Sequence, residues 1–146
     1  MDAVLVSACL AGRACRYDGT DEHQPALLEQ LEREGVAVVP FCPEEAGGLG
    51  TPRPAAKLHG GDGREVLDGR ATVRTESGSD VTEQFLDGAR QAVAAAKSGG
   101  CTVAYLKARS PSCGCVHVHM EAGLAEGYGV TAAALRRAGV TTISVD

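Results

Sequence analysis

Aromatic residues are scarce in this sequence: they make up 3% of its 146 residues, and tryptophan is absent. A core without large rings must be built mainly from Val, Leu and Ala. The hydrophobic fraction of 44% and the charged fraction of 23% are ordinary for a globular protein. A chain of this length can bury a substantial core in one domain. We therefore expect one α/β domain over residues 1–146.

Long apolar segments are also missing. No apolar run approaches the roughly 20 residues that a bilayer-spanning helix needs. The run Val4-Leu5-Val6 is too short for the apolar core of a signal peptide, and residue 2 is Asp. We therefore expect a cytoplasmic protein without a membrane partner, in which thiols stay reduced.

An excess of basic residues is the third absence. The net charge is −5, whereas binding to a nucleic-acid polymer requires a clustered basic surface. This charge disfavours nonspecific binding to DNA or RNA. It leaves a small neutral fragment, such as a free base, as a possible ligand.

Buried strands alternate with amphipathic helices along the chain, which predicts a mainly parallel sheet flanked by helices. The predicted strands are 3–6, 36–40, 102–106 and 140–145. The predicted helices begin at Pro25, at Asp80 and at Thr131, whose side chain is expected to cap the last one. Between Gly47 and Gly69 we expect a long loop followed by a small hairpin insertion across Asp68-Gly69.

Cysteine is the residue type that bears most directly on function. Three of the six cysteines, Cys9, Cys42 and Cys113, lie in short loops that follow predicted strands. The carboxyl ends of parallel strands meet at one edge of the sheet, where ligands usually bind. In a reducing compartment such thiols indicate a metal or iron–sulfur centre rather than a disulfide framework.

Two alternatives for the cysteines remain open from the residues alone. The three could be unrelated buried residues, because cysteine is commonly interior. They could also bind zinc in a Cys₃His site, with His117 or His119 as the fourth ligand. Of the other cysteines, Cys101 is expected in the core and Cys115 is expected to point away from Cys113.

Polar residues next to these thiols are candidates for acid–base chemistry and ligand binding. Glu44 follows Cys42 closely, and a carboxylate beside a desolvated metal pocket can act as an acid or base. Ser110 and Ser112 could orient water or substrate. Arg53, between two prolines, suits an acceptor on a ligand or a carboxylate within the protein.

Nine short motifs in fixed order resemble a bacterial family whose characterised members are thiouracil desulfidases. The resemblance spans essentially the whole chain. The motifs are Ser7-Ala8-Cys9-Leu10, Cys15-Arg16-Tyr17-Asp18-Gly19, Cys42-Pro43-Glu44, Gly47-Gly48-Leu49, Thr51-Pro52-Arg53-Pro54, Gly61-Asp62-Gly63, Asp80-Val81-Thr82, Ser110-Pro111-Ser112-Cys113-Gly114 and Gly129-Val130-Thr131-Ala132.

The resemblance implies a [4Fe-4S] cluster held by three cysteines, with one iron open to the thiocarbonyl sulfur of a thiolated base such as thiouracil. Water would replace sulfur without net redox change, releasing uracil and sulfide. The ligand positions map onto Cys9, Cys42 and Cys113, and the catalytic carboxylate and serine map onto Glu44 and Ser110. Family members often carry another residue at Cys15, which we therefore place outside the ligand set.

The remaining assignments concern substrate and alternatives. We expect Ser7, Arg53 and Ser112 to bind the substrate, a small thiolated base. Cys115 departs from the small residue that the family usually carries after Ser-Pro-Ser-Cys-Gly. The competing functions are a sulfur-transfer protein, a zinc-binding or redox-sensing module, and a small-molecule-binding domain with structural cysteines only.

Overall fold

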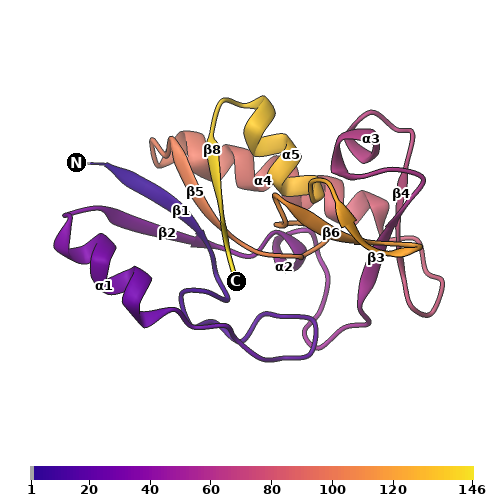
Figure 1. The fold of residues 1–146 in the computed structure, drawn as a ribbon, viewed down its shortest axis with the longest axis horizontal. Coiled ribbons are helices and arrows are strands. Elements are labelled where there is room, and N and C mark those ends of the chain that lie inside the picture. The colour runs from indigo at the N-terminus through magenta and orange to yellow at the C-terminus, as the bar shows by residue number, and fades with distance from the viewer. Residues whose placement is uncertain (1) are drawn as a thin grey trace.

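The computed structural model describes residues 2–146 and contains two four-stranded sheets, A and B (Figure 1). Sheet A is parallel, and its strands stand in the order β2-β1-β5-β8. Its strands are β1 (Ala3–Ser7), β2 (Ala37–Phe41), β5 (Val103–Lys107) and β8 (Thr141–Val145). These are the four predicted strands, with ends within one residue of prediction, so the expected parallel sheet is confirmed.

Helices cover both faces of sheet A. They are α1 (Pro25–Arg33) on one face, and α4 (Thr82–Ser98) and α5 (Val130–Arg137) on the other. Side chains alternate along β1, so Val4 and Val6 belong to the core with Leu31 of α1. Leu5 points to the other side and belongs to the core with Leu135 of α5.

Sheet B was not predicted as a sheet. Its order is β4-β3-β6-β7, with β3 and β6 parallel and the outer pairs antiparallel. Its strands are β3 (Ala56–His59), β4 (Thr72–Thr75), β6 (His117–Met120) and β7 (Gly123–Glu126). Each is four residues long and only partly buried, which leaves little apolar pattern for sequence analysis to detect.

The predicted hairpin across Asp68-Gly69 is wrong. The residues expected to form its first strand lie largely in a helix, α3 (Gly63–Leu67). The Asp62 carboxylate accepts a hydrogen bond from the Arg64 amide and so caps this helix. The strand after it, β4, pairs with β3 instead.

The predicted cap at Thr131 is also wrong. Helix α5 begins one residue earlier, and the Thr131 hydroxyl is buried without a hydrogen-bond partner. Free amides at the helix start donate instead to backbone carbonyls: Val130 N to Pro111 O at 3.0 Å and Ala132 N to Ser112 O at 3.0 Å. The start of α5 is therefore fastened to the loop that carries Cys113.

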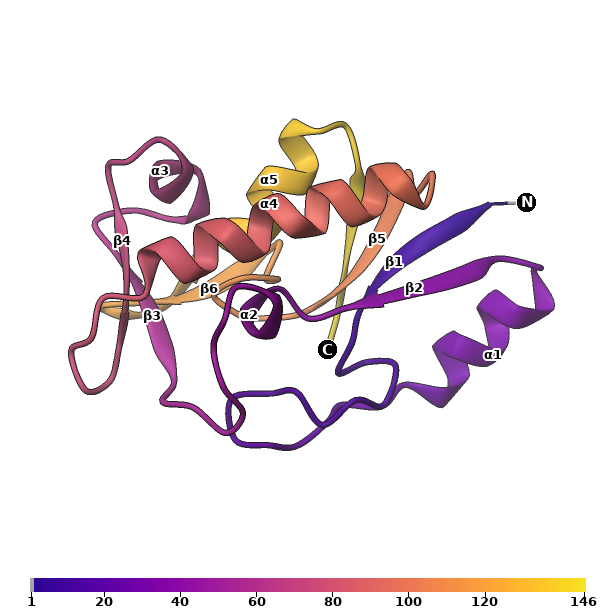
Figure 2. The ribbon, with the colours of Figure 1, turned by 180° about the vertical axis from the view of Figure 1, so that it is seen from behind.

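Helix α4 runs along both sheets and packs against each of them (Figure 2). Phe85 and Ala89 in its first half pack with Leu58 and Val118 of sheet B. Ala96 near its end packs with Leu106 of sheet A. Within residues 2–146, no helix has the length and apolar character needed to cross a membrane.

Candidate active site

Three cysteine loops meet beyond the carboxyl end of sheet A. Cys9 follows β1 and Cys42 follows β2, which pair directly, and Cys113 lies in the loop after β5 on the other side of β1. All three line one cavity of about 430 Å³. The expected convergence of these thiols is thus present, and a fourth, Cys15, lines the same cavity.

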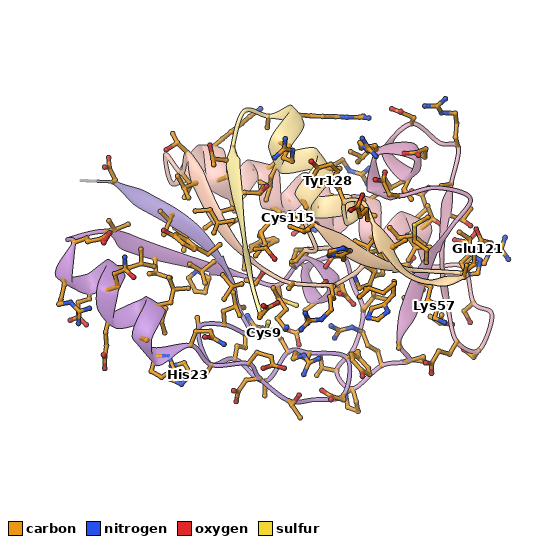
Figure 3. All side chains as sticks on the ribbon, viewed as in Figure 1. Cys9, His23, Lys57, Cys115, Glu121 and Tyr128 are labelled. Atoms are coloured by element: carbon orange, nitrogen blue, oxygen red, sulfur yellow. The ribbon has the colours of Figure 1, made fainter. Side chains whose placement is uncertain are left out.

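Sheet B forms the opposite wall of this cavity. Lys57 of β3 and His119 of β6 line it. Figure 3 shows Cys9, in the loop after β1 of sheet A, near the centre of the molecule, and Lys57 of β3 to its right. The cavity therefore lies between the loops of sheet A and sheet B, a common place for a small-molecule site.

Cys42 is positioned by a short helix, α2 (Pro43–Ala46), that starts immediately after it. This helix lies against α4 with backbone in contact with backbone. A Cβ added at Gly88 of α4 would lie 2.0 Å from the Pro43 carbonyl oxygen, and one at Gly47 would lie 2.0 Å from the Gln84 oxygen. Only glycine at these two positions permits such an approach, which holds Cys42 and Glu44 at the cavity.

Cys113 is positioned by its own loop. The Ser110 hydroxyl accepts hydrogen bonds from the amides of Ser112 (3.2 Å) and Cys113 (3.0 Å). Gly129, before α5, fits against this loop so closely that a Cβ would lie 2.5 Å from the Ser112 carbonyl. The loop is thus held from both sides, and its thiol has a defined direction.

Glu44 occupies the centre of a polar network in the cavity. Its Oε1 pairs with Nε of Arg53 at 3.0 Å, and its Oε2 accepts a hydrogen bond from the Ser112 hydroxyl at 3.1 Å. The side chains of Glu44 and Arg53 are 14% and 7% exposed. Removing either partner of such a shielded pair would leave an uncompensated charge, and the hydrogen bonds fix the carboxylate in one orientation.

Arg53 makes four hydrogen bonds to the protein and also lines the cavity. Besides Glu44, its guanidinium donates to Gly50 O (3.1 Å), to Thr51 Oγ1 (2.9 Å) and to Cys15 O (2.8 Å). From the sequence we expected Arg53 to bind either a ligand or a carboxylate of the protein, and the structure shows it bound to the carboxylate of Glu44. Arg53 therefore orients Glu44 and the Cys15 loop.

Ser7 and Ser112 line the cavity together with Cys113. Ser7 is buried and accepts a hydrogen bond from the Lys107 amide at 3.0 Å. Ser112 lies 3.6 Å from the Cys113 sulfur. Ser112, rather than Ser110, contacts Glu44 directly, and Ser110 Oγ lies 3.1 Å behind Ser112 Oγ.

Raised pKa values keep Cys15, Cys42 and Cys113 protonated at neutral pH in the absence of a metal. Burial raises the pKa of Cys113 to about 12, although hydrogen bonds from Ser7 and Ser112 oppose this. A hydrogen bond to Cys15 and burial raise the pKa of Cys42. A hydrogen bond from Cys42 lowers the pKa of Cys15, but its bond to Cys9 and its burial raise that pKa to about 11. A metal centre here must displace these protons.

Three thiols lining one cavity are the donor type that iron–sulfur clusters use. Among residues 2–146, no three His, Cys, Asp or Glu side chains are close enough to bind one metal ion together. The zinc alternative therefore lacks a preformed site, and both His117 and His119 are exposed. A four-iron cluster binds each cysteine through a different iron, so its ligands stand farther apart than those of one ion.

The two remaining cysteines lie outside the cavity lining. Cys101 is buried in the core between sheet A and helices α4 and α5, as expected, and Cys115 packs against the same core. Figure 3 shows Cys115 well away from Cys9. Cys115 is therefore outside the cavity that Cys113 lines.

Sequence reasoning missed several polar residues of the cavity, of which Lys107 is the most buried. Lys107, the last residue of β5, is buried and lines the cavity; burial, then the charge of Arg109, lower its pKa. Its position at the end of a strand was a usable signal. Cys15, which we placed outside the ligand set, lines the same cavity.

Comparison with known proteins agrees with this architecture. A curated relative, the uncharacterized protein YbbK of Bacillus subtilis (strain 168), is 39% identical over 144 residues, covering 97% of this chain and 94% of YbbK. A solved structure, the [4Fe-4S]-dependent thiouracil desulfidase TudS, superposes with a TM-score of 0.84 at 40% identity, covering 99% of this chain and 91% of TudS. The model of the 2-thiouracil desulfurase family matches residues 4–146. The chain belongs to the 2-thiouracil desulfurase family.

Proposed function

We propose that this protein removes sulfur from a thiolated nucleobase such as thiouracil, using water and releasing uracil and sulfide. Cys9, Cys42 and Cys113 are the proposed ligands of a [4Fe-4S] cluster. The observation that most strongly supports this proposal is that the Glu44 carboxylate, held in place by Arg53, shares one cavity with these three thiols. When bound, the cluster supplies an iron without a cysteine ligand, which binds the thiocarbonyl sulfur and acts as a Lewis acid.

Glu44 is the proposed general base. It takes a proton from water as the water oxygen bonds to the carbon that carries sulfur. The carbon–sulfur bond then breaks, and sulfur leaves as sulfide while the carbon keeps the new oxygen. Water supplies both the oxygen and the protons, so no electrons are exchanged with another reagent. Arg53 keeps the carboxylate in place by its hydrogen bond to Oε1.

Ser110 and Ser112 support this step. Ser110 Oγ already accepts two amide hydrogen bonds, so its own proton is available for Ser112 Oγ at 3.1 Å. Ser112 in turn donates to Glu44 Oε2. These two consecutive hydrogen bonds orient the carboxylate oxygen of Glu44. Through them Ser110 can affect catalysis without contacting Glu44 directly.

The test is reconstitution with iron and sulfide under anaerobic conditions. We expect an absorption band at about 400 nm from thiolate-to-iron charge transfer. Incubation with thiouracil should give uracil and sulfide in equal amounts, without a reductant or partner protein. Single Ala substitutions at Cys9, Cys42 or Cys113 should each abolish cluster binding.

Cys101→Ala provides the matched control, because Cys101 is a buried cysteine outside the cavity lining and should leave iron content unchanged. If the three single variants keep their full iron content, the ligand assignment is wrong. If free sulfide appears only when a partner protein is added, the protein is a sulfur-transfer protein instead. Stoichiometric zinc without iron after oxygen-free purification would contradict the cluster itself.

A further inference from the structure

Lys107 is a buried cation at the cavity without a partner in the protein. It is the last residue of β5, it lines the cavity, and it is 8% exposed. Within residues 2–146, its amine takes part in no ion pair and no hydrogen bond. The amine is also not one of the fully enclosed polar atoms that lack a partner. It is therefore open to the cavity.

The acidic residues around the cavity do not neutralise this amine. Glu76 lines the cavity but is exposed and forms no ion pair with Lys107. The other acids on or next to the lining pair with arginines: Glu44 with Arg53, Glu22 with Arg16, and Asp146 with Arg109.

The strand places Lys107 on the Cys9 side of sheet A. Side chains alternate along β5, and Tyr105, two residues before Lys107, packs against the core that contains Cys9. Leu106 points to the opposite core. The Lys107 amide donates to Ser7 Oγ at 3.0 Å, which fixes the end of β5 beside the start of the Cys9 loop.

A buried ammonium without a counter-charge is costly. Burial lowers the pKa of Lys107, which is the direction expected for such a group. An anion in the cavity would offset the cost and favour the charged form of the amine. The proposed reaction itself produces an anion there, because the sulfur of a neutral thiocarbonyl leaves as sulfide.

We propose that the Lys107 ammonium stabilises the negative charge that develops on sulfur as the carbon–sulfur bond breaks. This inference rests on the proposed function. A fixed positive charge interacts more strongly with anionic sulfur than with the uncharged thiocarbonyl. Lys107 should therefore increase the rate of bond cleavage and the affinity for hydrosulfide, with little effect on the affinity for the substrate.

The experiment compares anaerobically reconstituted variants in two measurements. Titration with sodium hydrosulfide, followed by visible absorption, gives a dissociation constant, and single-turnover kinetics give the rate of uracil formation. Lys107→Met removes the charge but keeps a long side chain. We expect it to weaken hydrosulfide binding and to slow uracil formation, each by roughly 10- to 100-fold, the value of one charge-assisted hydrogen bond.

Two further variants keep the test specific. Lys107→Arg retains the charge and should restore much of the hydrosulfide affinity. Lys97→Met removes a lysine from the exposed end of α4 and should change neither measurement. Lys107→Gln is a second neutral variant and takes the place of Lys107→Met if that protein does not fold.

Two results would overturn the inference. Unchanged hydrosulfide affinity in the neutral variants, with a raised KM for thiouracil, means that Lys107 binds the uncharged substrate instead. Loss of iron in the neutral variants and in Lys107→Arg alike, with Lys97→Met fully loaded, means that Lys107 only supports the fold. Failure of the unsubstituted protein to bind iron or to release sulfide would contradict the proposed function, so the two failures are distinguishable.

Discussion

At the scale of single residues, two adjacent acids in α2 have different surroundings. Glu44 faces the cavity and is held by Arg53 and Ser112. Glu45 does not line the cavity and pairs with Arg13 at 2.9 Å. Both are carboxylates in the first turn of α2. Comparing variants of the two therefore separates the effect on activity of a carboxylate at the cavity from that of negative charge on the helix.

Glu44→Gln removes the proposed base while keeping a side chain of similar size. We expect kcat for thiouracil to fall by about 10²–10⁴-fold, the usual contribution of a positioned general base. Iron content and the absorption spectrum should not change, since no proposed ligand is altered. Glu45→Gln is the control and should retain near-normal kcat. Equal losses in both variants would indicate a general effect of charge on α2 rather than proton transfer by Glu44.

At the scale of elements, the site depends on how α2 lies on α4. Strands β1 and β2 both end at the cavity. The direction of the Cys42 thiol, however, is set by helix α2, which starts directly after it. The absence of side chains at Gly47 and Gly88 lets the two helices approach until backbone atoms touch. Gln91 of α4 adds a hydrogen bond to the Ala46 carbonyl at 2.9 Å.

Gly88→Ala should therefore displace α2 and disturb the cavity from a distance. The added methyl group would overlap the Pro43 carbonyl, and such overpacking costs about 1–3 kcal/mol of unfolding free energy. We expect lower stability in urea unfolding together with a reduced iron content after reconstitution. Gly50→Ala, where a Cβ would meet nothing within 4 Å, is the matched control. Normal iron content in Gly88→Ala would show that α2 does not position Cys42.

At the scale of the whole molecule, Asp62 connects segments far apart in the sequence. It caps α3 through the Arg64 amide and accepts the Tyr128 amide at 3.1 Å, just before α5. Burial alone raises its pKa, but hydrogen bonds from Arg64 and Tyr128 outweigh that effect. They lower the pKa of Asp62 to about 2, from an ordinary value of 3.8.

A lowered pKa stabilises the folded protein above pH 3.8, and this contribution is lost as the pH falls through about 2. Asp62→Asn should reduce the free energy of unfolding at pH 7 by about 2 kcal/mol, as measured by urea denaturation. The difference from the unsubstituted protein should shrink between pH 4 and pH 2. Asp87→Asn, on α4 with a side chain that is 47% exposed, is the control. A difference that is independent of pH would mean that Asp62 acts by packing rather than by charge.

Much of sheet A could be predicted because its strands are short apolar runs bounded by turn residues, such as residues 3–6 before Ser7. Sheet B could not be predicted, because β3 and β6 pair across about sixty residues and each has few buried side chains. The helix cap at Asp62 could in principle have been predicted from the sequence. It was missed because Glu65-Val66-Leu67 before Asp68-Gly69 also matches a strand entering a turn.

By itself, the sequence determined the parallel sheet and the loops in which Cys9, Cys42 and Cys113 lie, because apolar periodicity and turn residues act locally along the chain. The family motifs placed Glu44 among these thiols. Only the tertiary structure decided that Cys15 shares their cavity, that Arg53 binds Glu44, and that Ser112 contacts Glu44 directly. These contacts join residues brought together by packing between elements, and no local pattern encodes the distance between them.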